Sequence, residues 1–301
     1  MGKRLVGVDV GGTAIKAGAI DAESGALLAQ AGRPIPAGCT PEQLMGLLIE
    51  LGRELRVEEH LGVGAPGLLD RERGQIVVSP NLHALDELPL RDGLDEALQL
   101  APGTTRLGND ADMAALGESW RGAGRGEPNF LMVTLGTGIG GGLILDGEVY
   151  TGAGLAGEIG HVTVDPDGPM CGCGRLGCLE TLSSATAAIR RARERGLPAE
   201  DPGNLVVLSE RARAEEGAER EVLQAVGRDL GRGLGAVVCL LDIRTFVFSG
   251  GFAGALDVLE PGIRSGFKES TYGDRVAEIR LLRASLDNTA GWIGAARLGQ
   301  G

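Results

Sequence analysis

The chain has 301 residues, of which 43% are hydrophobic, and its formal net charge at pH 7 is −12. This acidic balance argues against a protein that binds nucleic-acid backbones, because such proteins carry a basic surface. No apolar run is long enough to span a bilayer. We therefore expect one soluble unit with two lobes, in which backbone amides or a metal ion hold any anionic ligand.

The N-terminal part alternates strand and helix patterns, as α/β proteins do. Runs rich in β-branched residues indicate strands, and leucines at helical spacing indicate an amphipathic helix. Pro66 and Gly67 interrupt one of the strand patterns. The expected elements are strands over residues 4–10, 13–20 and 61–69, a turn at residues 21–25 that leads into a further strand, and a helix over residues 41–55.

The second half of the chain also alternates strand and helix patterns. The segment VTLGTGIGGGL resembles VDVGGTAIKAG near the N-terminus, which indicates a duplicated unit of strand, glycine-rich turn and strand. Before it, a loop after residue 105 is expected to become a helix that Asn109 or Asp110 caps. The elements expected after it are a strand over residues 130–135, a glycine-rich turn at 136–142, extended residues 143–145, a helix over 219–241, a strand over 245–248 and a C-terminal helix over 288–298.

Both copies of the unit contain a turn that suits phosphate binding, because glycine lets consecutive N–H groups approach an oxyanion closely. Gly136, Gly138 and Gly141 also match the dinucleotide-binding pattern, but that pattern must open a helix, and strand-forming residues follow here. Two tight hairpins without a ligand remain the alternative interpretation.

Four side chains near these turns are candidates for contacts with a nucleotide. Asp9 ends the first strand, where a carboxylate can hold Mg²⁺ through water against phosphates. Lys16 is a candidate for contact with a terminal phosphate. Thr13 and Thr137 could donate hydroxyl hydrogen bonds to phosphate oxygens. Each of the four also has an ordinary reading, as a turn-forming aspartate, a solvated lysine or a strand threonine.

A possible metal site lies in the stretch EIGHVTVDPDGPMCGCGRLGCLE, residues 158–180. His161, Cys171, Cys173 and Cys178 would fill a tetrahedral zinc shell and leave no position for an activating water, so the zinc would be structural. A disulfide is the alternative, but the chain opens without an apolar signal segment, so we expect a reducing cytoplasm. Cys39 and Cys239 are expected to be ordinary buried residues.

Together these motifs resemble the ROK family of sugar kinases, over nearly the whole chain, and within that family they look most like bacterial ATP-dependent glucokinases. The glycine motifs are shared with the wider actin and hexokinase superfamily, whereas the zinc stretch combined with Asn109 and Asp110 is specific. The matching motifs are DVGGT at residues 9–13 with Lys16, GAPG at 64–67, NDA at 109–111 with ALGE at 115–118, TLGTGIGGG at 134–142, and the stretch 158–180.

The resemblance implies a two-lobed, actin-like ATPase (ribonuclease H-like) α/β fold with an active-site cleft and a zinc loop. The smaller lobe would comprise residues 1–117 and 288–301, and the larger lobe residues 118–287. ATP, Mg²⁺ and a structural Zn²⁺ are the implied cofactors, and a homodimer or homotetramer is the implied assembly.

The resemblance also implies site residues, with Asp110 as the general base. Asp112, where many relatives carry asparagine, is expected to help cap the helix rather than to enter the site. The implied sugar-binding residues are Gly67, Asn81, Asn109, Asp110, Glu158, His161 and Glu180, and the implied nucleotide-binding residues are Asp9, Gly11, Gly12, Thr13, Lys16, Gly136, Thr137, Gly138, Gly140, Gly141, Gly142, Gly250 and Gly251.

The expected function is phosphoryl transfer from ATP to the 6-hydroxyl of glucose. N-acetylmannosamine, N-acetylglucosamine or fructose are alternative substrates that the sequence separates poorly. A ROK-type sugar-responsive regulator is a remote alternative, because no DNA-binding module precedes the first strand. A zinc hydrolase is disfavoured, because a filled Cys and His shell cannot activate water.

Overall fold

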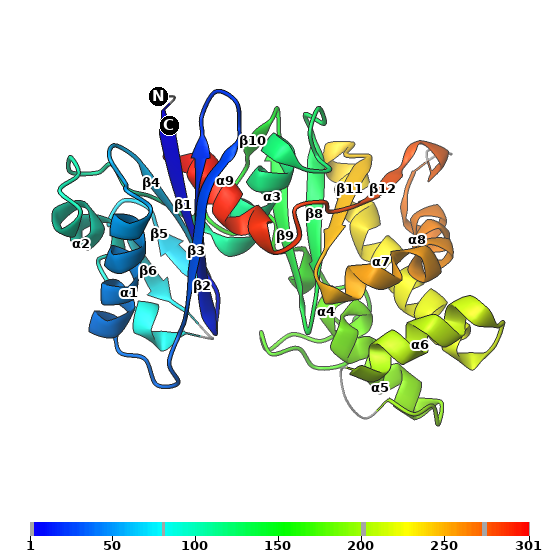
Figure 1. Cartoon of the computed structure of the whole chain (residues 1–301). Coiled ribbons are helices and arrows are strands. Elements are labelled where there is room, and N and C mark those ends of the chain that lie inside the picture. The colour runs from blue at the N-terminus through cyan, green and yellow to red at the C-terminus, as the bar shows by residue number, and fades with distance from the viewer. Residues whose placement is uncertain (1–2, 80–81, 200–202, 273–275, 301) are drawn as a thin grey trace. The chain divides into compact units, whose positions relative to one another are not determined.

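The computed structural model describes residues 3–79, 82–199, 203–272 and 276–300 (Figure 1). The chain divides into two compact α/β units. Unit 1 comprises residues 1–128, 142–156 and 285–301, and unit 2 comprises residues 129–141 and 157–284. The expected two-lobed α/β fold is confirmed. Among the described residues, none of the helices combines the length and apolar character that crossing a membrane requires.

Unit 1 is built on a five-stranded sheet with the order β3-β2-β1-β4-β7. The first three strands form an antiparallel meander, and β1, β4 and β7 run parallel, so the carboxyl ends of these three strands meet at one edge. The strands are β1 (Arg4–Val10), β2 (Ala14–Asp21), β3 (Leu27–Pro34), β4 (Leu61–Ala65) and β7 (Arg106–Asn109), and a separate hairpin contains β5 (Leu68–Asp70) and β6 (Gln75–Val78).

Helices α1 (Pro41–Glu54), α2 (Leu90–Ala97), α3 (Asp110–Arg121) and α9 (Ala290–Gly299) belong to this unit, with the 3₁₀ turns η1 (His83–Leu85) and η5 (Asp287–Thr289). Leu44, Leu48 and Leu51 of α1 are buried, as their helical spacing predicted. Helix α9 approaches the sheet very closely, since a Cβ on Gly62 of β4 would lie 1.7 Å from the carbonyl oxygen of Ala295.

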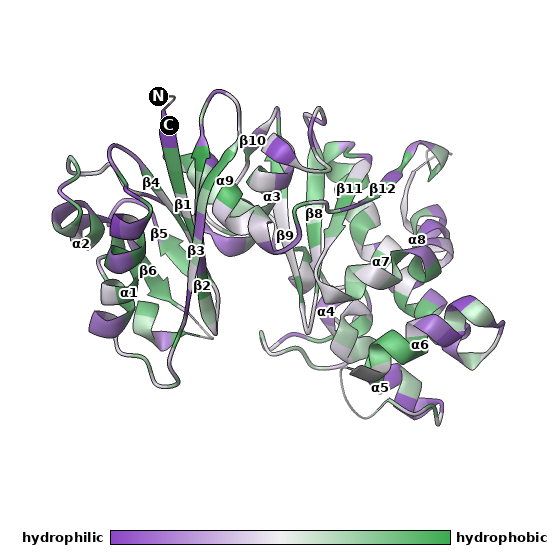
Figure 2. Cartoon of the chain, in the orientation of Figure 1, coloured by the Kyte–Doolittle hydropathy of each residue, from purple (hydrophilic) through white to green (hydrophobic). Residues whose placement is uncertain are grey.

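The second sheet has the order β10-β9-β8-β11-β12, with β8, β11 and β12 parallel. Figure 2 shows that β8, like β1 in the first sheet, is largely hydrophobic, as expected of strands in the middle of a sheet. The strands are β8 (Phe130–Leu135), β9 (Ile139–Leu145), β10 (Glu148–Val149), β11 (Thr245–Ser249) and β12 (Arg280–Arg283). The helices of unit 2 are α4 (Leu179–Ser183), α5 (Ala185–Glu194), α6 (Gly203–Ala214), α7 (Ala218–Leu241) and α8 (Leu256–Ser270), with the 3₁₀ turns η2 (Ile159–His161), η3 (Gly251–Ala255) and η4 (Val276–Glu278).

Two expectations about local structure were wrong, and one was confirmed. The glycine-rich turn ends at Gly138, because β9 begins at Ile139 and continues through the next three glycines. The interruption predicted at Pro66 and Gly67 is confirmed, because these two residues separate β4 from β5. Both Cys39 and Cys239 were expected to be buried, but Cys39 is half-buried in the loop before α1, and Cys239 is exposed in the last turn of α7.

A buried carboxylate anchors the chain where it returns to unit 1. Glu118 of α3 is fully buried, and it accepts hydrogen bonds from the backbone N–H groups of Ala123, Ser285 and Leu286 at 2.6–3.2 Å. The glutamate of the ALGE motif is therefore a structural residue that joins the end of α3 to the segment before α9.

Replacing Glu118 by alanine is expected to lower the free energy of unfolding by about 3–5 kcal/mol, because a fully buried side chain is lost and three backbone N–H groups lose their acceptor. Urea denaturation would measure this loss. Glu58→Ala, at an exposed position, serves as the control and should stay within about 0.5 kcal/mol of wild type. Equal stability of the two variants would contradict the anchoring role.

Candidate active site and metal centre

The carboxyl ends of three parallel strands bring together the predicted catalytic and sugar-binding residues of unit 1. Asn109 ends β7 and caps α3, since its Oδ1 accepts the backbone N–H of Ala111 at 2.9 Å. The Asn109 Nδ2 donates to the carbonyl of Gly67 at 3.4 Å. Gly67 follows β4 with φ +116°, a left-handed conformation that other residues rarely adopt. Asn109 therefore fixes both the first turn of α3, where Asp110 lies, and the loop after β4.

Asp9 and Asp110 form a pair of carboxylates with raised proton affinity. The pKa of Asp9 is raised to about 6, mainly by burial and in part by the neighbouring Asp110 carboxylate, while Lys16 opposes the shift. Burial also raises the pKa of Asp110, while the backbone N–H of Ala111 lowers it. The predicted base Asp110 is therefore a charged neighbour of Asp9, near the end of β1. A cation held between two such carboxylates would relieve their repulsion.

Asp112 lies in the first turn of α3, as expected, although the capping side chain is Asn109. Asp112 is buried, and its Oδ2 is 3.9 Å from Nη2 of Arg71. Arg71 also donates to Oγ1 of Thr151 at 2.7 Å. The sequence carried no signal for Arg71, because its partners lie far along the chain and the residue itself is exposed.

The first glycine-rich turn joins β1 to β2. The Gly11 N–H donates to the Ala14 carbonyl at 3.0 Å, and Gly12 and Thr13 are exposed at the tip. Lys16 lies opposite Asp9 in the β1–β2 register, and its Nζ donates to Oδ1 of Asn288 at 3.2 Å. Sequence reasoning missed Asn288, which is 272 residues away from Lys16 in the chain.

The second glycine-rich turn, Gly136 to Gly138, follows β8 in unit 2. The Gly136 N–H donates to the Gly138 carbonyl at 3.0 Å, and the turn opens strand β9 rather than a helix, which excludes the dinucleotide-binding interpretation. The start of α5 holds the turn, because the Ala185 N–H donates to the Gly136 carbonyl and Thr186 Oγ1 donates to the Thr137 carbonyl.

Gly250 and Gly251 follow β11, the parallel neighbour of β8, so the two loops leave the same edge of the sheet. Gly250 has φ +87°, and a Cβ there would lie 2.4 Å from the carbonyl oxygen of Leu135.

Gly140, Gly141 and Gly142 lie within β9. The last two are closely packed: a Cβ on Gly141 would lie 2.5 Å from the Gly157 carbonyl oxygen, and one on Gly142 would lie 2.6 Å from the Ala111 carbonyl oxygen. A phosphate contact by these three residues stays a prediction.

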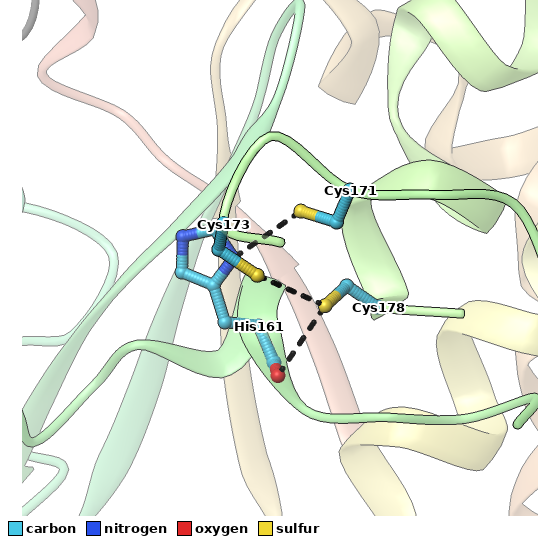
Figure 3. A group of neighbouring side chains, drawn as sticks. All are labelled: His161, Cys171, Cys173 and Cys178. Carbon is cyan, nitrogen blue, oxygen red and sulfur yellow. Dashed lines mark hydrogen bonds between the residues drawn. The ribbon is translucent and has the colours of Figure 1, made fainter. Parts of the chain in front are cut away.

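The predicted metal ligands form one cluster in unit 2 (Figure 3). One ligand atom from each of His161, Cys171, Cys173 and Cys178 lies within 4.8 Å of all the others. The Cys173 and Cys178 Sγ atoms are 3.5 Å apart, and the Cys171 Sγ is 3.7 Å from His161 Nδ1. Ligands around a tetrahedral zinc would be about 3.6–3.8 Å apart, so these residues fit a zinc ion. All five cysteines are unbridged, and the disulfide alternative has no support.

The proton affinity of the thiols makes metal binding depend on pH. Burial raises the pKa of Cys171 to about 12 and also raises the pKa of Cys178. The backbone N–H and the side chain of Arg175 lower the pKa of exposed Cys173 to about 6. A metal ion has to displace protons from the two buried thiols, so its affinity should increase with pH.

Two glutamates of the same stretch flank the cluster. Glu180, in the first turn of α4, has its Oε1 3.0 Å from the Cys171 Sγ and 3.8 Å from His161 Nδ1. Glu158 is exposed, with its Oε2 4.0 Å from His161 Nε2. The Nδ1 of His161 thus faces the thiols and the other ring nitrogen faces Glu158, which leaves Nε2 available to a ligand. The remaining predicted sugar-binding residue, Asn81, lies outside the described residues.

Comparisons with known proteins agree with this architecture. The ROK family profile matches residues 5–301. The glucokinase of Thermotoga maritima is 32% identical, with 98% of this chain and 96% of the relative covered. The N-acetylmannosamine kinase of Escherichia fergusonii is 31% identical, with 98% and 97% covered.

Among solved structures, a ROK family glucokinase from Streptomyces griseus in complex with glucose and AMPPNP superimposes with a TM-score of 0.77. It is 31% identical, and the match covers 99% of this chain and all of that one. The two-lobed α/β fold is thus the ROK and actin-like fold, and the His and Cys₃ cluster is consistent with a zinc site. By sequence and by structure, the chain belongs to the ROK family.

Proposed function

We propose that this protein is an ATP-dependent hexose kinase that transfers the γ-phosphoryl group to the 6-hydroxyl of glucose. The observation that carries the proposal is Asp110, a half-buried carboxylate with a raised pKa at the first position of α3, next to Asn109. The glucokinase relatives, one of them in complex with glucose and AMPPNP, support glucose as the acceptor.

Asp110 acts as the general base in this proposal. Its carboxylate accepts the proton of the 6-hydroxyl as the hydroxyl oxygen bonds to the γ-phosphorus and the bond to ADP breaks. The other sugar hydroxyls are assigned to polar side chains that offer matching donors and acceptors. The assigned residues are Asn81, Asn109, Glu158, His161 and Glu180, together with the loop at Gly67.

The nucleotide is assigned to the exposed backbone of the glycine-rich turns, residues 11–13 and 136–138, and to the turn at Gly250 and Gly251. Lys16 is assigned to the terminal phosphate. The Asp9 and Asp110 carboxylates fit a divalent cation, because the neighbouring Asp110 disfavours the charged form of Asp9, and Asp9 would hold Mg²⁺ there through water. Bound Mg²⁺ would neutralise charge on the transferred phosphoryl group.

Zinc held by His161 and the three cysteines would have a structural role. A shell of four protein ligands leaves no site for water, so its contribution is to order the loop that carries Glu158 and Glu180. His161 would bind the metal through Nδ1 and a sugar hydroxyl through Nε2, which fixes its tautomer.

An assay of ADP release with a panel of sugars tests the proposal. We expect glucose to give a higher kcat/KM than fructose, N-acetylglucosamine or N-acetylmannosamine. The relative from Escherichia fergusonii makes N-acetylmannosamine the main competing substrate. Comparing ATP with polyphosphate identifies the donor. The absence of phosphorylation with every sugar and both donors would refute the kinase assignment and favour the regulator alternative.

The dependence of activity on Mg²⁺ should change with pH. The pKa of Asp9 is raised to about 6, so its carboxylate gains a proton as the pH falls through that range and loses its attraction for a cation. We expect the apparent Mg²⁺ affinity to weaken about tenfold per pH unit below pH 6. Steady-state kinetics at subsaturating Mg²⁺ between pH 5 and 8 measure this, and an affinity that does not vary over this range would exclude Asp9 as the ligand.

A further inference from the structure

The segment that leads into the C-terminal helix contacts both residues assigned to the phosphate end of the nucleotide. This entry segment, residues 287–291, comprises η5 and the first two residues of α9. It is held firmly, since Glu118 binds the backbone of the two preceding residues and the Thr289 N–H and Oγ1 both donate to the Leu286 carbonyl, at 2.9 and 2.6 Å.

The first contact involves Lys16. Its Nζ donates to Oδ1 of Asn288 at 3.2 Å. An ammonium group has three N–H donors on a flexible stem, so one bond to a neutral amide oxygen restricts its position, keeps its charge and leaves two donors for another ligand. Asn288 therefore orients Lys16 without neutralising it.

The second contact involves Asp9. A Cβ built on Gly291 would have the Asp9 carboxylate as its three nearest neighbours, at 2.6 Å from Cγ and 2.7 and 2.9 Å from the two oxygens. Asp9 thus occupies the space that a side chain at position 291 would fill. The backbone of the surrounding elements lies further away, so a methyl group there would displace this carboxylate in particular.

We propose that the entry segment is a positioning element for phosphoryl transfer, in which Asn288 orients Lys16 and the absent side chain of Gly291 gives the Asp9 carboxylate its place. The inference rests on the proposed function and extends it, since it adds two positioning residues from the far end of the chain. Neither residue stood out in the sequence.

Gly291→Ala tests the second contact. Calorimetric titration with ADP in the presence of Mg²⁺ should give binding at least tenfold weaker than wild type, and kcat/KM for ATP should fall by a similar factor. The KM for the sugar should stay within about threefold. Gly46→Ala in α1 is the matched control, because a Cβ there meets nothing within 4 Å. Its binding of ADP with Mg²⁺ should equal that of wild type.

Asn288→Asp tests the first contact and should fold normally, because it changes one exposed amide. A carboxylate at this position would compete with phosphate for Lys16, so the KM for ATP should rise about tenfold. Asn288→Leu removes the acceptor and should raise this KM about threefold. Asn129→Asp, at another exposed position, controls for the added negative charge and should leave the KM unchanged.

The outcomes separate this inference from the kinase assignment. If the wild-type protein phosphorylates no sugar but binds ADP with Mg²⁺, the proposed kinase activity is refuted. The calorimetric comparison of variants then still tests the role of the entry segment. Wild-type nucleotide binding by both Gly291→Ala and Asn288→Asp would overturn the inference, as would an effect confined to the KM for the sugar. A wild-type protein that binds no nucleotide would overturn both.

Discussion

Replacing Asp110 by asparagine is expected to lower kcat about 10²–10⁴-fold, the range that general-base catalysis contributes. The amide is nearly isosteric, and Asn109 continues to cap α3, so the fold should persist. The dissociation constant of the sugar should change by less than about threefold, because an amide still hydrogen-bonds a hydroxyl. Single-turnover kinetics and calorimetry with glucose measure the two effects separately.

The same variant should be as stable as wild type or more stable. A raised pKa means that folding favours the protonated form of Asp110, so this group stabilises the protein at low pH and loses that contribution as the pH rises through its folded pKa. Asparagine is neutral at every pH and avoids the penalty at pH 7. Asp112→Asn, two residues along the same helix, is the matched control and should change kcat less than tenfold. Comparable losses of turnover in the two variants would contradict the assignment of Asp110 as the general base.

Replacing Cys178 by serine is expected to abolish stoichiometric zinc binding. The Cys178 side chain is fully buried at the start of α4, and a closed shell of four ligands tolerates the loss of one poorly. Structural zinc contributes about 10–16 kcal/mol of apparent binding free energy in small zinc domains, so the loop that depends on it should lose its order. Glu180 is two residues further along, and the KM for the sugar should therefore rise at least tenfold.

Elemental analysis of the purified protein and sugar kinetics test this expectation together. Cys239→Ser is the matched control, because Cys239 is exposed on α7 outside the cluster, and it should keep both the zinc content and the KM of wild type. Full zinc occupancy in Cys178→Ser would show that the cluster is not the metal site.

Much of the local structure could be predicted from the sequence. Strand β1 has the bounds that its β-branched residues predicted, α1 buries the expected leucines, and Asn109 caps α3. These features depend on residues a few positions apart, whose periodicity and capping chemistry are readable in the chain. The four metal ligands were recognisable for the same reason, since all lie within eighteen consecutive residues.

Helix α8 is an element whose local sequence pattern does not predict a continuous helix. Pro261 and two glycines weaken its helical signal, yet α8 is continuous, because it packs closely on α7 and a Cβ on Gly262 would lie 2.1 Å from the Gln224 carbonyl. Close packing between two helices overrode the low intrinsic propensity of these residues.

The sequence was sufficient to predict the family, the two-lobed α/β class and the cluster of metal ligands, and it singled out Asp110 as the proposed base. The folded structure was needed to show that Asp110 raises the pKa of Asp9, that Arg71 lies 3.9 Å from Asp112, and that Asn288 and Gly291 adjoin Lys16 and Asp9. The reason is physical: motifs and periodicity report neighbours along the chain, whereas burial, proton affinity and contact between residues 9 and 291 arise only when distant strands and helices pack together.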